Sequence, residues 1–235
     1  MLREIYFDES YHEKTGRIGV SATMATTGQW EHFVRDWGGV LAAKSVAPGE
    51  FHAQSGGKVQ RELNLSLAGL LSNLGICSTC VTLRTNDFEA NTTLEQRGNY
   101  GGVFGFARYV AILSLSLGFE DAGRSGEFAY YADQGGRGLD WFMQTLRTIA
   151  ANDSLRRQYR LTKHGVVDRR VHLPVHAADL VAHEVITHRH TSEPLNVLGR
   201  QVLVDDWNGD EVREVLNDFS QSRERLKKIR DKNRR

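Results

Sequence analysis

EIYFDESY, residues 4–11, opens the chain with an apolar run that ends on two adjacent carboxylates. Residues 5–7 are isoleucine, tyrosine and phenylalanine, which are typical of a strand because β-branched and aromatic side chains fit a half-buried pleated surface. Asp8 and Glu9 follow them directly. Such a strand either ends in an ordinary turn or forms one edge of a functional site, and the rest of the sequence has to distinguish the two.

The composition is that of a globular protein with a substantial core. Hydrophobic residues make up 40% of the 235 positions, a length that suits one large domain or one domain with an insertion. No run of about 18 apolar residues is present, so no membrane span is expected. The chain starts with a strand-like segment instead of a charged-then-apolar leader, and it has only two cysteines. We therefore expect a cytoplasmic protein without a disulfide scaffold.

Positive charge is concentrated at the C-terminal end, although the formal net charge is only +1. Residues 220–235 carry eight Lys or Arg against two acidic residues, which gives this segment a charge of +6. We expect a main domain over residues 1–209 and an amphipathic basic helix over residues 210–235. Such a helix is either a solvated surface or a contact for a polyanion. The nucleic-acid contacts predicted in it are Arg223, Arg225, Lys227, Lys228 and Arg230.

Strand-like and helix-like periodicities alternate along the chain. Strands are predicted at about residues 3–8, 17–26, 79–85 and 126–133, with a short one within 165–173. Helices are predicted at about residues 28–43, 59–74, 101–117, 139–151 and 174–190, with a last one from about residue 210. Residues 198–210 show no clear pattern and are expected to be a connector. An opening strand pair followed by alternating strands and helices predicts an α/β fold.

Three aspartates stand where an α/β sheet forms ligand sites. Asp8 and Asp133 each end an apolar strand, and ligands of such sheets bind outside the carboxyl ends of the strands. Asp179 lies at the border of the buried face of an apolar helix, where an unpaired charge is costly. At 100° per residue, His176, Asp179 and His183 fall within about 60° of one another.

Carboxylates that converge repel one another unless a cation lies between them. Mg²⁺ and Mn²⁺ prefer hard oxygen ligands, and two such ions about 4 Å apart can activate water against a phosphodiester. The pattern therefore predicts a metal site at Asp8, Asp133 and Asp179. The structural alternatives are a turn cap for Asp8 and a partly exposed helix position for Asp179.

Four short motifs, taken in order, resemble a known family. They are IYFDES at 5–10, EFHAQ at 50–54, YYADQ at 130–134 and AADLVAHEV at 177–185. The chain resembles a bacterial and phage family of unknown function in the ribonuclease H-like superfamily, which opens on a strand ending Asp-Glu-Ser and closes on a helix carrying Ala-Asp-Leu. The motifs span most of the chain. The resemblance implies a ribonuclease H-like mixed sheet flanked by helices and a carboxylate cluster for a divalent metal.

The resemblance also implies roles for single residues besides the three aspartates, which match its metal ligands. Glu9 matches the second carboxylate of the opening motif, and His52 matches a histidine that follows an acidic and a hydrophobic residue. His176 stands three residues before Asp179, where relatives often have Gln and some resolvases of the superfamily have His. Tyr11 is a departure, because the family usually has Gly after Asp-Glu-Ser.

Three other motifs suggest different chemistry, and each has a simpler explanation. HEVITH at 183–188 places its histidines about 140° apart on a helix, which does not suit one zinc ion. CSTC at 77–80 has redox spacing but precedes a strand, so ordinary buried thiols are favoured. DQGGRG at 133–138 matches no phosphate-binding pattern, and a flexible loop is favoured, from which Arg137 could meet a nucleic-acid phosphate.

These patterns together predict a nuclease that uses Mg²⁺ or Mn²⁺ to hydrolyse phosphodiester bonds in nucleic acid. His52, His176 or His183 would assist proton transfer, and Glu9 would belong to the catalytic group. The main alternative is an inactive ribonuclease H-like module that binds nucleic acid or a protein partner, of the kind linked to phage or defence systems. A hydrolase of small phosphorylated molecules is a third class, and a homo-oligomer is compatible with all three.

Overall fold

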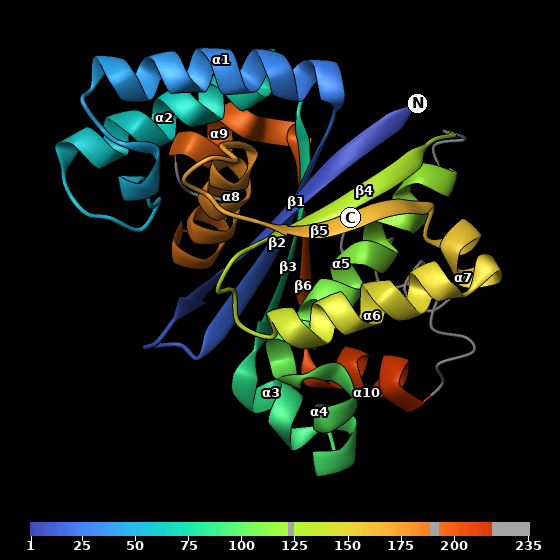
Figure 1. Cartoon of the computed structure of the whole chain (residues 1–235). Helices are drawn as coiled ribbons and strands as arrows, with labels where there is room; N and C mark the ends of the chain where they lie inside the picture. The colour runs from blue at the N-terminus through green and yellow to red at the C-terminus, as the bar shows by residue number, and fades with distance from the viewer. Residues whose placement is uncertain (122–124, 189–192, 218–235) are drawn as a thin grey trace.

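A hairpin of two long strands begins the fold in this computed structural model, which describes residues 1–121, 125–188 and 193–217 (Figure 1). β1 (Leu2–His12) pairs antiparallel with β2 (Arg17–Thr26). β2 has the predicted bounds, but β1 continues beyond Asp8, where its end was predicted. The reason is that β1 pairs with two strands: its parallel pairing on one side ends at Phe7, whereas its antiparallel pairing with β2 runs on to His12. The alternative explanation of Asp8 as a turn cap is therefore wrong, because Asp8 lies within β1.

Six strands form one mixed sheet in the order β5-β4-β1-β2-β3-β6. The remaining strands are β3 (Cys77–Arg84), β4 (Glu127–Asp133), β5 (Leu161–Val167) and β6 (Val202–Trp207). β3 pairs antiparallel with β2, whereas the pairs β1–β4, β4–β5 and β3–β6 are parallel. This mixed sheet, flanked by helices, confirms the expected ribonuclease H-like fold class.

Helices cover both faces of the sheet (Figure 1). On one side lie α1 (Thr27–Ala43), α2 (Lys58–Asn73), α8 (Pro174–His188) and α9 (Glu193–Leu198). On the other side lie α5 (Gly102–Asp121), α6 (Leu139–Ala151) and α7 (Asp153–Gln158), with α3 (Thr85–Ala90), α4 (Leu94–Tyr100) and α10 (Gly209–Asn217) at one end. Short 3₁₀ turns occupy Pro48–Glu50 and Gly199–Gln201. The long helices match the predicted ranges closely.

Two hydrophobic cores result, one on each side of the sheet, and β1 contributes to both. Ile5 and Phe7 belong to the core under α5 and α6, whereas Tyr6 belongs to the core under α1, α2 and α8. This follows from the alternation of side chains along a strand. The same alternation sends Asp8 toward α8 and Glu9 toward α5, so the two adjacent carboxylates have separate surroundings.

Short elements are where the predictions from sequence were wrong. β6 lies in the segment expected to be a connector, and β5 begins and ends earlier than the segment expected to form that strand. α3, α4 and α7 have six or seven residues each, which is less than two helical turns and too short for a repeating apolar pattern. α4 instead begins with a capping box, in which Thr93 and Gln96 satisfy each other's backbone N–H groups.

α5 is the central helix of its core. Its stretch Gly102–Phe119 is long and apolar enough to cross a membrane by length and composition, but 83% of that stretch is buried inside the protein. A helix in the core of a protein can have the same length and composition, because burial on all sides demands an apolar surface as a bilayer does. The packing of α5 is that of a core helix.

Gly105 in α5 is needed for the close packing of α4, α5 and α6. A Cβ atom at this position would lie 1.8 Å from the carbonyl oxygen of Tyr100 and 2.9 Å from the ring of Trp141. We expect Gly105→Ala to lower the free energy of unfolding by about 1–3 kcal/mol, because the backbone must move to admit the methyl group. Urea denaturation measures this.

Gly69→Ala in α2 is the matched control for that prediction. A Cβ at Gly69 meets nothing within 4 Å, so the alanine is expected to stabilise the helix by up to about 1 kcal/mol. Equal effects of the two substitutions on the urea midpoint would contradict the packing argument.

Candidate active site

Two of the predicted aspartates meet because β1 and β4 are parallel neighbours. Phe7 pairs with Ala132 in the last register position, so Asp8 and Asp133 follow at the same level of the sheet. Tyr6 and Tyr131 precede them by two residues and both contact the core under α8, which places the two carboxylates on that face. Asp8 is 5% exposed and Asp133 is 8% exposed.

The third aspartate comes from α8, which packs across β1 and β2. Gly19 of β2 permits a close approach, since a Cβ there would lie 2.5 Å from the side chain of Ile186. Asp179 therefore lies against the strand ends with only 7% of its surface exposed, so the alternative of a partly exposed helix position is wrong. The backbone N–H of Ala53 donates to Asp179 Oδ2 at 3.1 Å and fixes the carboxylate.

Arg169 lies at the point where the three aspartates converge. Its Nη2 donates to Asp8 Oδ2 at 2.5 Å and its Nε to Asp133 Oδ2 at 2.7 Å. Its Nη1 lies 3.5 Å from Asp179 Oδ2. One guanidinium therefore touches one oxygen of each carboxylate and provides the positive charge that the sequence argument assigned to a metal ion.

Arg169 was not predicted as a site residue from the sequence. It follows β5 by two residues, and β5 is the parallel neighbour of β4, so its position obeys the same strand-end rule that pointed to Asp8 and Asp133. The signal was hidden because the strand was expected within residues 165–173, which would have placed Arg169 inside it.

The charges of the cluster do not balance. Three ionised aspartates against one guanidinium leave an excess charge of −2 in a buried site. Burial, together with the negative charge of Asp179, raises the pKa of Asp8 well above its ordinary value despite Arg169. Burial also raises the pKa of Asp179, although Arg169 and the N–H of Ala53 oppose the change. The site therefore attracts protons or a further cation.

Arg169 itself remains charged. Burial alone lowers the pKa of its guanidinium, but Asp8, Asp179 and Asp133 together raise the pKa above its ordinary value. The cation at the centre is thus a permanent one, and only movement of the side chain can remove it from the carboxylates.

His52 joins the cluster from the loop after the first 3₁₀ turn. Arg169 Nη1 donates to His52 Nδ1 at 2.5 Å. His52 Nδ1 also lies 4.0 Å from Asp179 Oδ2. The histidine side chain is 45% exposed, whereas the aspartates are buried. The structure therefore brings this predicted residue to the cluster, at the boundary between the carboxylates and solvent.

A cavity of about 310 Å³ opens above the cluster. It is lined by Asp8, Asp133, Asp179, Arg169 and His52, and further by Glu9, Ser10, Gln54, Gln134, Gly135 and Gly136. Its walls come from five segments: β1, the loop at 52–54, the end of β4, the connection between β5 and α8, and α8 itself. All three predicted metal ligands and one predicted proton-transfer residue thus share one polar cavity.

Glu9 lines the cavity but belongs to a different network of contacts. Its carboxylate forms an ion pair with Arg108, a fully buried residue of α5, and its Oε1 accepts from the backbone N–H of Arg137 at 2.5 Å. Arg108 also donates to the carbonyl of Arg137. Glu9 and Arg108 therefore fasten residues 134–138 to β1, which is a structural contact and leaves Glu9 apart from the three aspartates.

His176 is buried and does not line the cavity. Trp37 Nε1 donates to its Nδ1 at 2.9 Å, and its ring lies 4.9 Å from the ring of Phe51. Burial, with a contribution from the charge of Arg169, lowers the pKa of His176 to about 3. The predicted proton-transfer role does not fit this placement, because the imidazole is neutral, fixed by Trp37 and without access to the cavity.

His183 also lies outside the carboxylate cavity. It lines a neighbouring cavity of about 420 Å³ together with Asn64, Glu184 and Glu193. Asn64 donates to the carbonyl of Ala53 and to Glu184 at 3.0 Å each. These hydrogen bonds hold the segment whose backbone N–H binds Asp179. The structure does not bring His183 to the three aspartates.

Arg137 is exposed next to the carboxylate cavity. Its guanidinium lies 5.3 Å from the ring centres of Tyr11 and Phe104. The other predicted nucleic-acid contacts, Arg223, Arg225, Lys227, Lys228 and Arg230, lie outside the described residues. The expected buried thiols are confirmed only for Cys80, since Cys77 is exposed at the start of β3.

The donor chemistry of the cluster suits a divalent metal, but the space is filled. Three carboxylate oxygens converge, as Mg²⁺ and Mn²⁺ prefer, and the guanidinium of Arg169 stands between them. Among residues 1–121, 125–188 and 193–217, no three His, Cys, Asp or Glu side chains are placed to hold a metal ion as they stand. A metal would fit only after Arg169 has moved. In comparisons with protein-family models, curated proteins and solved structures, nothing matches this chain, so the geometry of the site carries the functional argument.

Proposed function

We propose that the carboxylate cavity is the active site of a divalent-metal-dependent phosphodiesterase that acts on nucleic acid. The observation that carries the proposal is the convergence of three buried aspartates, from β1, β4 and α8, with more negative charge than their one guanidinium neutralises. The ion fits only once Arg169 has left the carboxylates. A divalent cation then puts two positive charges where the guanidinium had put one, which lowers the excess negative charge of the three ionised aspartates from −2 to −1 in a buried site.

Asp8, Asp133 and Asp179 would hold Mg²⁺ or Mn²⁺ through their Oδ atoms. When bound, such an ion lowers the pKa of a coordinated water and neutralises charge on the phosphate. Arg169 would leave the carboxylates to make room. It lies on the connection between β5 and α8, and its planar guanidinium can pair with two oxygens of a phosphate as well as with carboxylates. We therefore assign Arg169 to the scissile phosphate in the metal-loaded protein.

His52 is the residue we assign to proton transfer. It is the only one of the three predicted histidines that lines the carboxylate cavity. Its contact with Arg169 Nη1 would be released when the guanidinium moves, which leaves Nδ1 able to accept a proton near the phosphate. A half-exposed imidazole can exchange that proton with solvent.

Nucleic acid is the substrate class that the surroundings favour. The cavity is open and polar, and the exposed guanidinium of Arg137 lies beside it between two aromatic rings, Tyr11 and Phe104. Arginine and aromatic side chains on one surface suit a chain of phosphates and bases. The basic segment at residues 220–235 would add salt-dependent affinity for the same polyanion.

A second candidate function follows from the fit of Arg169 between the carboxylates. If the guanidinium remains there permanently, the site cannot take a metal ion, and the protein is a non-catalytic ribonuclease H-like module that binds nucleic acid or a protein. The two candidates differ in a simple measurement. A cation that binds the native state raises the melting temperature, and a permanently filled site gives no shift with Mn²⁺.

Cleavage assays test the proposed function directly. The substrates are labelled single- and double-stranded DNA and RNA, each with Mn²⁺, with Mg²⁺ and with EDTA. We expect metal-dependent cleavage that falls by at least about a hundredfold in Asp8→Asn and Asp179→Asn, because each substitution removes a charge that holds the cation. Glu9→Gln is expected to retain cleavage, since its carboxylate contacts Arg108 and the loop.

Asp36→Asn is the matched control, because this carboxylate lies on α1, pairs with its neighbour Arg35 and does not line the cavity. It should cleave like the wild type. Cleavage that persists in EDTA, or that survives in Asp179→Asn, would contradict the proposal. Absence of cleavage together with absence of an Mn²⁺-dependent melting shift would leave the non-catalytic module.

A further inference from the structure

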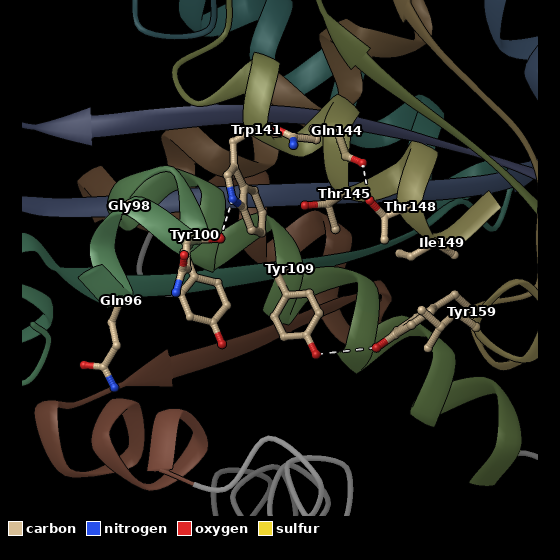
Figure 2. A pocket seen from close by; sticks show the side chains of 12 residues that line it. Gln96, Gly98, Tyr100, Tyr109, Trp141, Gln144, Thr145, Thr148, Ile149 and Tyr159 are labelled. Atoms are coloured by element: carbon tan, nitrogen blue, oxygen red, sulfur yellow. Dashed lines mark hydrogen bonds between the residues drawn. The ribbon is translucent and has the colours of Figure 1, made fainter. Parts of the chain in front are cut away.

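A larger cavity lies on the opposite side of the sheet from the carboxylate site. It has a volume of about 620 Å³ and is bounded by α4, α5, α6 and α7 (Figure 2). Its lining side chains include Gln96, Asn99, Tyr100, Tyr109, Trp141, Gln144, Thr145, Thr148 and Tyr159. Cavities that bind small molecules usually have volumes of about 300–1,000 Å³, so the space suits a ligand of nucleoside size.

The lining combines aromatic rings with neutral polar groups. Four aromatic residues contribute rings, and three residues contribute side-chain amides, of which Asn99 and Gln144 are exposed. No Asp, Glu, Lys or Arg occurs among the described residues that line the cavity. An ionic group buried there would meet no opposite charge, which makes a charged ligand unfavourable.

Trp141 forms one wall and is held in place from two directions. Its Nε1 donates to the carbonyl of Asn99, and its ring centre lies 5.8 Å from that of Tyr100. A Cβ at Gly101 would lie 2.4 Å from the Trp141 side chain, and a Cβ at Gly105 would lie 2.9 Å from its ring. The glycines at the start of α5 thus allow the indole to pack against the α4–α5 junction.

Three tyrosines, Tyr100, Tyr109 and Tyr159, also line the cavity. The hydroxyls of Tyr109 and Tyr159 lie 3.4 Å apart (Figure 2). Burial, together with a smaller effect of Tyr159, raises the pKa of Tyr100 to about 12, so its hydroxyl stays neutral in the physiological range. Neutral hydroxyls and amides can both donate and accept hydrogen bonds, which suits a ligand whose edge carries both kinds of group.

We propose that this cavity binds an uncharged planar heteroaromatic ring, such as the base of a nucleoside. One flat face of the ring would stack against the wall that Trp141 and Tyr100 form together, as bases stack on aromatic side chains in other sites. The amides of Gln144 and Asn99 would pair with the polar edge of the ring. This inference does not depend on the proposed nuclease activity, because the cavity shares no lining residue with the carboxylate site.

Isothermal titration calorimetry of the full chain tests the inference with three probes: adenosine, indole and inorganic phosphate. We expect saturable 1:1 binding of adenosine, weaker binding of indole, which stacks but has a less polar edge, and no binding of phosphate. Thr148→Trp, at an exposed position on α6, is expected to abolish the binding of adenosine and of indole by filling the cavity. Gln144→Ala is expected to weaken the affinity for adenosine by about five- to tenfold and to leave the affinity for indole unchanged.

Two controls keep the result specific. Val34→Trp adds the same side chain at an exposed position of α1, on the other side of the sheet, and should bind adenosine like the wild type. Asp179→Asn should do the same, because it alters only the carboxylate site. Circular dichroism and melting temperature check that each variant is folded. The proposal is overturned if millimolar adenosine gives no saturable binding, if Thr148→Trp binds normally, or if Asp179→Asn abolishes the binding.

Discussion

Arg169→Ala is expected to lower the free energy of unfolding in metal-free buffer by about 3–5 kcal/mol, because it leaves buried carboxylates without a partner. The side chain contacts Asp8, Asp133 and Asp179, and all three are buried. Asp8 and Asp179 already have raised pKa values with the guanidinium present. Urea denaturation in EDTA measures the loss, and Arg169→Lys is the matched variant that keeps a positive charge without the planar fork.

The same variant tests whether the cluster can hold a metal. With the guanidinium removed, Mn²⁺ no longer competes with an internal cation, so its affinity is expected to rise by about tenfold or more over the wild type. Mn²⁺ should then recover most of the lost stability, whereas cleavage should stay low because the phosphate has lost its guanidinium contact. The role of Arg169 as counter-ion is contradicted if Arg169→Ala is as stable as the wild type in EDTA, and the metal site is contradicted if Mn²⁺ stabilises neither protein.

His176 is expected to make the protein sensitive to acid. Its folded-state pKa of about 3 lies below the value of about 6.5 for an unfolded histidine, so the unfolded state binds more protons between these two pH values. Stability therefore falls as the pH falls through this window, by about 1.4 kcal/mol per pH unit and by about 4 kcal/mol near pH 3. The contribution is fully present above the unfolded pKa.

His176→Gln isolates this effect. Glutamine cannot titrate, and its side-chain oxygen can still accept the hydrogen bond from Trp37 Nε1. The wild type should lose stability relative to His176→Gln as the pH is lowered from 7 to 4 in a series of urea titrations. His172→Gln, at an exposed position before α8, is the matched control and should follow the wild type. Parallel pH profiles for wild type and His176→Gln would show that the buried histidine is not neutral in the folded protein.

Much of the fold could be predicted from periodicity. The bounds of β2 and α6 and the approximate positions of α1, α2, α5 and α8 follow from the spacing of their apolar residues. Long amphipathic elements repeat their pattern several times, which makes the signal local and strong. β6 was missed because an edge strand of six residues does not repeat its pattern enough to be distinguished from a connector.

The three aspartates could be predicted as a group because each follows a local rule. Asp8 and Asp133 end apolar runs, and Asp179 interrupts an apolar helix. Their convergence requires β1 and β4 to be parallel neighbours, a pairing of distant segments that a local pattern does not reveal. The strand order in the sheet fulfils that condition.

The separate surroundings of Asp8 and Glu9 show what a local pattern does not reveal. The two carboxylates are adjacent in sequence, and strand alternation turns them to opposite faces of the sheet. Which face holds α8 and which holds α5 depends on how the later helices cross over the sheet. Asp8 therefore joins the aspartate cluster and Glu9 pairs with Arg108, a residue 99 positions away.

The sequence by itself determined the long strands and helices, their α/β class and the three aspartates as candidate site residues, and its resemblance to a known family implied the ribonuclease H-like class. Apolar periodicity and strand-end carboxylates are local features, and local features are written directly in the order of residues. Only the tertiary structure decided that Arg169 provides the charge between the aspartates, that His176 is buried against Trp37, and that an aromatic cavity forms behind the sheet. Each of these depends on contacts between segments far apart in the chain, where strand order and helix packing select which charges and rings meet.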